Sequence, residues 1–137
     1  MKKFTLVILF ILIMSNFAFA FQPAVIGGVR NNGAAIGLMA EHGRFFNANL
    51  RFGAEATSGT NPVLIFYGGK FLLGNLAKGV PVSLALSILG NFGNTFHAGF
   101  GIALNIDRIF GYKPLFAELG VDLLEAPKLQ AQLGLKF

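Results

Sequence analysis

Apolar and polar residues alternate with a period of two along most of the chain after residue 20. In residues 80–92 and 96–107, large apolar side chains occupy one set of alternate positions, with Leu89 as an exception. Small, polar and charged residues occupy the other set. A helix would spread these residues around its circumference, whereas a strand separates them onto two faces. The pattern therefore predicts β-strands in these two segments.

The same alternation recurs in residues 45–56, 115–123 and 128–137, and more weakly in residues 34–41. Residues 24–30 and 62–73 alternate poorly, and in the second segment we expect a bulge at Gly68-Gly69-Lys70 that shifts the register. Together these segments predict about eight strands of about ten residues, the length that a tilted strand needs to cross a bilayer. Turn residues lie between them, at 31–33, 42–43, 57–62, 75–79, 93–94, 107–114 and 125–127.

The first twenty residues have a different pattern. Two lysines precede an apolar run over residues 4–14, in which Thr5 is the one polar residue, and Ser15 and Asn16 end that run. Ala18-Phe19-Ala20 then supplies the small-x-small site of a signal peptidase. We therefore predict a secretory signal peptide at residues 1–20, cleaved after Ala20, and one domain at residues 21–137. The chain has no cysteine, so this exported domain forms no disulfide.

The composition is unusual for a soluble domain, and this affects how the alternation of apolar and polar residues is interpreted. The chain is 54% hydrophobic and 12% charged, whereas an ordinary globular domain has about 25% charged residues. After the predicted signal peptide, no run of apolar residues is long enough for a membrane-spanning helix. Because only helices and closed barrels satisfy their backbone groups in lipid, we expect an all-β protein. The expected fold is a closed antiparallel up-and-down transmembrane β-barrel of about eight strands.

The second face of the predicted strands is suited to the interior of such a barrel. It carries Gly, Ala, Ser and Asn, which fit the narrow lumen of an eight-stranded barrel. Buried charges need partners, so we expect Glu118 and Asp122 to face inward and to pair with Arg51, Lys128 or Lys136. The alternative is that these charges are solvated on the surface of a secreted β-sandwich. The expected polar cluster of the lumen contains Glu41, Arg51, Glu55, His97, Asp107, Glu118, Asp122, Lys128 and Lys136.

The last strand ends on an aromatic residue, with apolar residues at the alternate positions Leu129, Ala131, Leu133, Leu135 and Phe137. In this respect residues 21–137 resemble the small eight-stranded outer-membrane β-barrel proteins of bacteria. The resemblance implies location in the bacterial outer membrane, with outer-membrane lipid and the barrel-assembly machinery as partners. It also implies that Leu129, Leu133, Leu135 and Phe137 form the assembly signal. The chain departs from this family in having Leu135 third from the end, no Trp and only two Tyr.

Phenylalanines near the predicted strand ends could replace the usual Trp and Tyr belts at the membrane interfaces. We expect this role for Phe45, Phe46, Phe92, Phe96, Phe116 and Phe137.

No motif for catalysis or for binding a cofactor or metal is found, and the chain has no basic cluster suited to nucleic acid. The predicted loops are short and the barrel is too narrow for a porin. We therefore expect a monomer, not an enzyme, with a structural or envelope-integrity role and slow passage of small solutes. Two alternatives stay open: a lipid-modifying outer-membrane enzyme that uses His97 with a serine such as Ser83 or Ser87, and a secreted soluble lipid-binding barrel.

Overall fold

The computed structural model describes residue 8, residues 21–45 and residues 48–137. The predicted signal peptide at residues 1–20 therefore lies outside the described residues, except for residue 8. The domain consists of eight antiparallel strands that close into one barrel, with each strand bonded to the next one along the chain. This confirms the predicted all-β, up-and-down closed barrel. The elements are β1 (Phe21–Arg30), β2 (Gly33–Phe45), β3 (Ala48–Thr57), β4 (Val63–Ala77), β5 (Val80–Phe92), β6 (Phe96–Asp107), the 3₁₀ turn η1 (Ile109–Gly111), β7 (Leu115–Leu124) and β8 (Ala126–Lys136).

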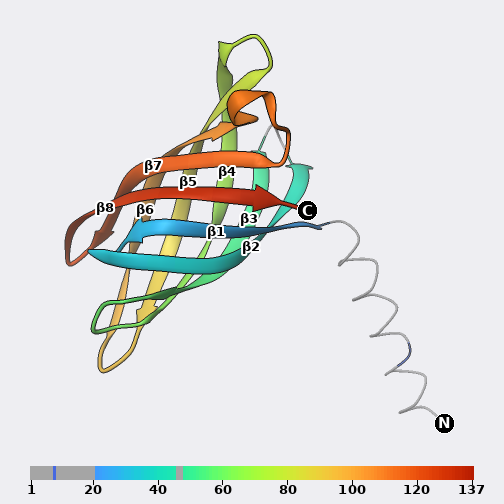
Figure 1. Cartoon of the computed structure of the whole chain (residues 1–137). Coiled ribbons are helices and arrows are strands. Elements are labelled where there is room, and N and C mark those ends of the chain that lie inside the picture. The colour runs from blue at the N-terminus through green and yellow to red at the C-terminus, as the bar shows by residue number, and fades with distance from the viewer. Residues whose placement is uncertain (1–7, 9–20, 46–47) are drawn as a thin grey trace.

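The first and last strands close the barrel. β8 pairs with β7, and its other edge pairs with β1 in a register that runs from Ala24↔Lys136 to Val29↔Ala131. Figure 1 shows the red β8 beside the blue β1. The expected pairing of the last strand with both its predecessor and the first strand is therefore confirmed. Neither strand has a free edge along this register, which satisfies the backbone groups within the protein.

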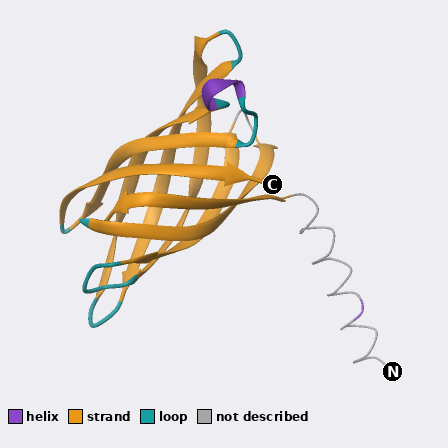
Figure 2. Cartoon of the chain, in the orientation of Figure 1, coloured by secondary structure: helices purple, strands orange, loops and turns teal. Residues whose placement is uncertain are grey.

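The two ends of the barrel differ in their connections (Figure 2). The turn end carries the connections β1–β2, β3–β4, β5–β6 and β7–β8. The terminus end carries residue 21, the C-terminus and the other connections, including η1. At this end the β4–β5 hairpin projects past its neighbours, because β4 has no β3 partner after Phe71. Among the described residues, no helix has the length and hydropathy needed to span a bilayer.

The turn predicted at His42-Gly43 is wrong. β2 continues through these residues to Phe45, and the register with β3 shifts between His42 and Arg44. A glycine next to a polar residue is typical of a turn, but it suits a β-bulge equally well. Phe45 therefore ends β2 and does not begin the next strand. Phe46, assigned to that next strand, lies outside the described residues.

The bulge predicted at Gly68-Gly69-Lys70 is also wrong. The register between β4 and β5 is continuous from Val63 to Leu72, and it shifts only between Leu72 and Gly74 and between Asn75 and Ala77. The segment is apolar on both faces because Leu64 and Phe66 face the barrel core while their neighbours face outward.

The last strand begins earlier than expected, at Ala126, because Glu125 alone makes the turn with a φ of 52°.

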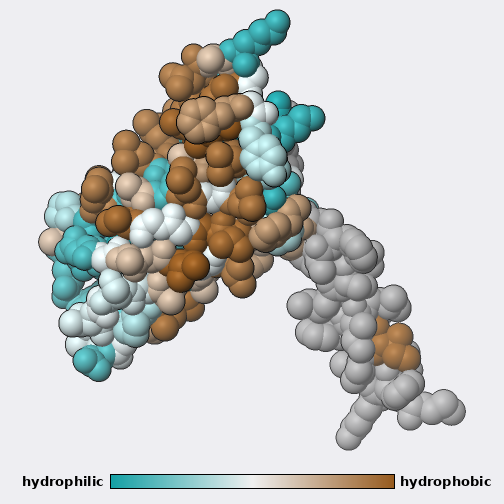
Figure 3. All heavy atoms as spheres, in the orientation of Figure 1, coloured by the Kyte–Doolittle hydropathy of each residue, from teal (hydrophilic) through white to brown (hydrophobic). Residues whose placement is uncertain are grey.

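Large apolar side chains cover the outside of the barrel. Most of the alternate residues predicted on the apolar faces are exposed, for example Ile88, Phe100 and Leu133. Figure 3 shows them gathered over the middle of the visible face, with hydrophilic residues toward the ends. Leu89, the exception in the alternation of β5, is buried inside.

A small apolar cluster lies within the barrel beside the buried charges. Two phenylalanine rings in it lie over glycines, because a Cβ atom at Gly53 would collide with the ring of Phe66, and one at Gly134 with the ring of Phe116. Phe116 is fully buried, so its predicted place in an interfacial belt is wrong. Because residues 116, 118 and 122 are separated by even numbers of positions along β7, Phe116 lies on the same inner face as Glu118 and Asp122. The cluster comprises Ala24, Ile26, Met39, Leu64, Phe66, Leu89, Phe116 and Leu124.

Candidate functional site

The centre of the barrel is occupied by an ion pair between β3 and β7. Arg51 Nη1 lies 2.5 Å from Glu118 Oε1, and both side chains are almost completely buried. Glu118 also accepts hydrogen bonds from Asn105 Nδ2 at 3.0 Å and from Gln130 Nε2 at 2.9 Å. The carboxylate is thus surrounded by donors from three other strands, which is the environment that a desolvated charge requires.

Toward the turn end, Arg30 binds two further carboxylates. Its Nε and Nη2 donate to the two oxygens of Asp122 at 2.7 and 3.1 Å, and its Nη1 donates to Glu55 at 2.5 Å. Gln132 donates to the other oxygen of Glu55 at 2.6 Å. Because Gln130 donates to both Gln132 and Glu118, this arm is continuous with the central pair.

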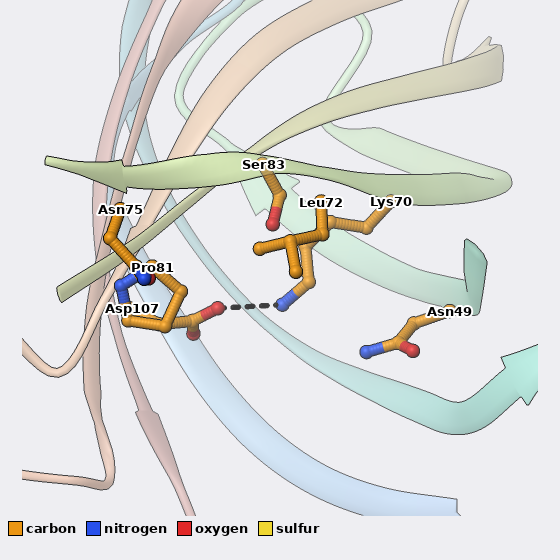
Figure 4. A pocket seen from close by; sticks show the side chains of 7 residues that line it. All are labelled: Asn49, Lys70, Leu72, Asn75, Pro81, Ser83 and Asp107. Atoms are coloured by element: carbon orange, nitrogen blue, oxygen red, sulfur yellow. Dashed lines mark hydrogen bonds and ion pairs between the residues drawn. The ribbon is translucent and has the colours of Figure 1, made fainter. Parts of the chain in front are cut away.

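Toward the terminus end, two lysines and two carboxylates form a second arm. Lys70 Nζ lies 3.0 Å from both oxygens of Glu41 and 3.1 Å from Asp107 Oδ2. Lys136 Nζ lies 2.7 Å from Asp107 and 3.4 Å from Glu41. Figure 4 shows Lys70 and Asp107 pointing toward each other across this end of the lumen. Asn105, 3.5 Å from Lys70, links this arm to Glu118.

Three of the four bases of this network also lie over aromatic rings. The guanidinium carbons of Arg30 and Arg51 are 5.2 and 5.4 Å from the ring centroid of Phe66. Lys136 Nζ is 5.3 Å from the centroid of Phe116. Each distance is within the range of a cation–π interaction. The rings of Phe66 and Phe116 therefore add contacts to these cations besides those that the carboxylates make.

Sequence reasoning missed two of the bases in this network. Arg30 ends a Gly-rich strand whose alternation is weak, and Lys70 lies where a bulge was expected to change the face. The inward position of Lys70 could have been predicted from an unbroken strand, because Lys70 then lies on the same face as Leu64, Phe66 and Gly68. Of the three bases expected to pair with Glu118 and Asp122, only Arg51 does so. Lys136 binds Asp107 and Glu41, and Lys128 donates to Asn31 at 2.8 Å.

At the turn end, His97 lies in a separate group of polar residues. Its Nε2 is 2.9 Å from the hydroxyl oxygen of Thr95, and its Nδ1 is 3.0 Å from Glu125 Oε1. Ser83 pairs with Asn105 in the β5–β6 register, eight positions along the strand from the Asn91↔His97 pair, or about 26 Å at 3.3 Å per residue. The expected partnership with Ser83 or Ser87 is therefore replaced by contacts with Thr95 and Glu125, neither of which was singled out from the sequence.

A polar pocket of about 230 Å³ adjoins His97. Asn91 lines it, is 2% exposed, and has a side-chain oxygen Oδ1 without a hydrogen-bond partner. Glu125 and Lys128 bring one charge of each sign to its wall. The complete lining is Asn31, Asn32, Gly59, Thr60, Asn61, Asn91, His97, Glu125 and Lys128.

The residues expected to form the assembly signal lie on the outer face of β8 or just beyond its end. Leu129, Leu133, Leu135 and Phe137 are all exposed, at 57%, 59%, 39% and 66%. Their register with β7 and β1 places them where the barrel closes. Over the part of the chain that the structure describes, no group of three or more His, Asp or Glu residues is arranged to hold a metal ion.

Comparison with known proteins identifies no relatives: the chain matches no protein-family model, no curated protein sequence and no solved structure.

Proposed function

We propose that the protein is an integral outer-membrane β-barrel with a structural role in the cell envelope. The observation that carries this proposal is that the inner and outer faces of the barrel have the reverse of the polarity usual in a soluble protein. Apolar side chains cover the outside, while Arg30, Arg51, Glu55, Glu118 and Asp122 are at most 2% exposed. A soluble domain would expose its charges and bury its large apolar residues, whereas lipid requires the opposite arrangement.

The interior argues against the alternative of a secreted lipid-binding barrel. Such a barrel needs an apolar cavity that a ligand can enter. Here the centre of the lumen is occupied by the ion pair of Arg51 and Glu118 and by the amides of Asn105, Gln130 and Gln132, all of them buried. An acyl chain placed there would separate Arg51 from Glu118 and break the hydrogen bonds that Asn105 and Gln130 donate to Glu118.

The same packing argues for a closed lumen. Five carboxylates and four bases pair with one another in a network that extends from Asp122 near the turn end to Lys136 near the terminus end. A hydrated solute would have to separate these pairs, and leaving one partner of a buried ion pair uncompensated costs about 3–5 kcal/mol. We therefore favour a rigid, sealed barrel over slow passage of solutes.

The location is tested by fractionating cells that produce the chain. We expect the protein to sediment with outer membranes, to remain there in high salt and in alkaline carbonate, and to require detergent for extraction. On gels, the folded barrel should migrate differently from the boiled protein. Recovery of folded protein in the soluble fraction without detergent would overturn the membrane assignment.

The sealed lumen is tested separately, in planar bilayers that contain the purified protein. We expect no stepwise ion current. As a matched positive control, Arg51→Ala combined with Glu118→Ala removes the central pair without leaving an unpaired charge, and this variant should conduct more than the parent. Regular current steps from the parent protein would contradict the structural role but leave the membrane location standing.

A further inference from the structure

Three side chains at the turn end are arranged as a hydroxyl, an imidazole and a carboxylate in series. The hydroxyl of Thr95 contacts His97 Nε2 at 2.9 Å, and the opposite ring nitrogen, Nδ1, faces Glu125 at 3.0 Å. In the tautomer with the proton on Nδ1, which the carboxylate favours, the lone pair of Nε2 is directed at the hydroxyl, whose oxygen also accepts a hydrogen bond from Asn61 Nδ2 at 3.1 Å. This is the relation through which an imidazole activates a hydroxyl as a nucleophile.

A second observation indicates a ligand at the same place. The polar pocket beside His97 contains Asn91, whose Oδ1 is buried without a partner in the structure. A buried acceptor without a partner is unfavourable, and a hydroxyl or amide donor of a bound molecule would satisfy it. The neighbouring Asn31, Asn32 and Asn61 make the wall rich in amides, which suits a polar group with several hydroxyls.

The outer face next to this pocket accepts an apolar chain. Thr95 lies exposed in the β5–β6 connection, next to Phe96, which begins β6, faces outward and is 59% exposed. Phe96 and Phe92, with ring centroids 4.8 Å apart, end a shallow apolar groove of about 250 Å³ that also includes Ile65, Tyr67 and Ile88. A molecule with one polar and one apolar part could therefore lie across the rim, with its junction at Thr95.

We propose that Thr95, His97 and Glu125 hydrolyse a carboxylic ester of an amphiphile, with the hydroxyl-rich part in the polar pocket and the acyl chain in the outer groove. His97 Nε2 accepts the proton of Thr95 as Oγ1 attacks the ester carbonyl carbon. The carbon–oxygen bond to the alcohol then breaks, and His97 returns the proton to the departing oxygen. Water, deprotonated by His97, attacks the acyl-threonine and releases the acid and free Thr95. The sum is ester plus water giving acid plus alcohol, with no change in oxidation state.

Charge on the tetrahedral intermediate requires a donor or a cation nearby. Lys128 lines the same pocket, and its ammonium group has three protons, of which one is donated to Asn31. Among the described residues that line this pocket, Lys128 is the one lysine or arginine. Its role is to stabilise the oxyanion.

The experiment uses the folded protein in detergent micelles with p-nitrophenyl butyrate as substrate. We expect turnover by the parent protein, a loss of about 100-fold or more in Thr95→Val and His97→Asn, and retention of activity in Thr95→Ser. Ser87→Ala, which alters the serine that the sequence placed near His97, should leave the rate unchanged. A fluorophosphonate probe should label Thr95, as located by peptide mass mapping. The folded state of every variant is checked by its heat-dependent mobility on gels.

Two outcomes would overturn the assignment: hydrolysis by the parent no faster than by Thr95→Val, or labelling at a residue other than Thr95. The amphiphile is tested by replacing butyrate with a long-chain ester. Phe96→Ser should reduce turnover of the long-chain ester more than that of butyrate, and an equal effect on both would defeat the groove assignment. Because butyrate hydrolysis in micelles does not depend on location in the cell, these results are independent of the proposed membrane role.

Discussion

Arg30 on β1 binds both carboxylate oxygens of Asp122 on β7, a residue 92 positions away in the chain, and on its remaining nitrogen it binds Glu55 on β3. The planar guanidinium is suited to this arrangement, because its five donors form a fork that a lysine does not have. One side chain thereby joins three strands across the lumen near the turn end. Its loss would leave two buried carboxylates with too few donors.

Replacing Arg30 with Met should lower the free energy of unfolding by about 3–5 kcal/mol, the usual effect of removing one partner from a buried ion pair. Urea unfolding in detergent micelles, followed by far-ultraviolet circular dichroism, measures the change. Arg108→Met is the matched control, because Arg108 is exposed in the β6–β7 connection. Adding Glu55→Gln and Asp122→Asn to Arg30→Met should restore part of the loss. If Arg30→Met and Arg108→Met unfold at the same urea concentration, the ionic network does not stabilise the barrel.

Gly134→Ala should destabilise the barrel by about 1–3 kcal/mol, the range for overpacking a filled interior. The added methyl group would meet the ring of Phe116, which is fully buried and has no free space to move into. Gly43→Ala is the control, since a Cβ atom there has no heavy atom within 4 Å. The same urea titration compares the two variants. Equal stabilities would show that the ring of Phe116 does not occupy the position described here.

A lysine introduced on the outer face should lower the stability of the barrel by an amount that depends on its depth in the bilayer. Leu119 lies in the middle of β7 and Leu76 in the projecting β4–β5 hairpin, and both are well exposed. For a barrel in lipid, Leu119→Lys should lower stability by about 2–4 kcal/mol, and Leu76→Lys by about 0–1 kcal/mol. Urea unfolding from lipid vesicles provides the measurement. Similar small effects at both positions would be evidence that the middle of the barrel faces water.

Deleting Phe137 or replacing Leu135 with Asp should block assembly into the outer membrane. The charge alone has a modest effect near the barrel end, so the expected loss comes mainly from disrupting the assembly signal implied by the family resemblance. Phe110→Asp is the control, because Phe110 is 97% exposed in η1 at the same end. Membrane fractionation and heat-dependent gel mobility report the outcome. Wild-type amounts of folded barrel in the outer membrane for either variant would refute the signal.

Much of the architecture could be predicted from the sequence because strand periodicity is local. The alternation at residues 96–107 and 115–123 separates the inner and outer faces without knowledge of any partner strand. The outward position of Leu133 and the inward positions of Glu118 and Asp122 follow from the same rule. Pairing of β8 with β1 was also predictable, because the sequence predicted a transmembrane sheet and such a sheet would need a closed edge.

What the sequence could not determine was which charges meet and which glycines bend the chain. Arg30 contacts Asp122, and Thr95 and Glu125 meet at His97, only because hydrogen-bond registers between strands align them around the lumen. Those registers also depend on whether the glycine beside His42 makes a turn or a bulge, which the same residues allow equally. Periodicity specifies the face on which a side chain lies, whereas its height in the barrel and its neighbour across the lumen are set only when all eight strands close.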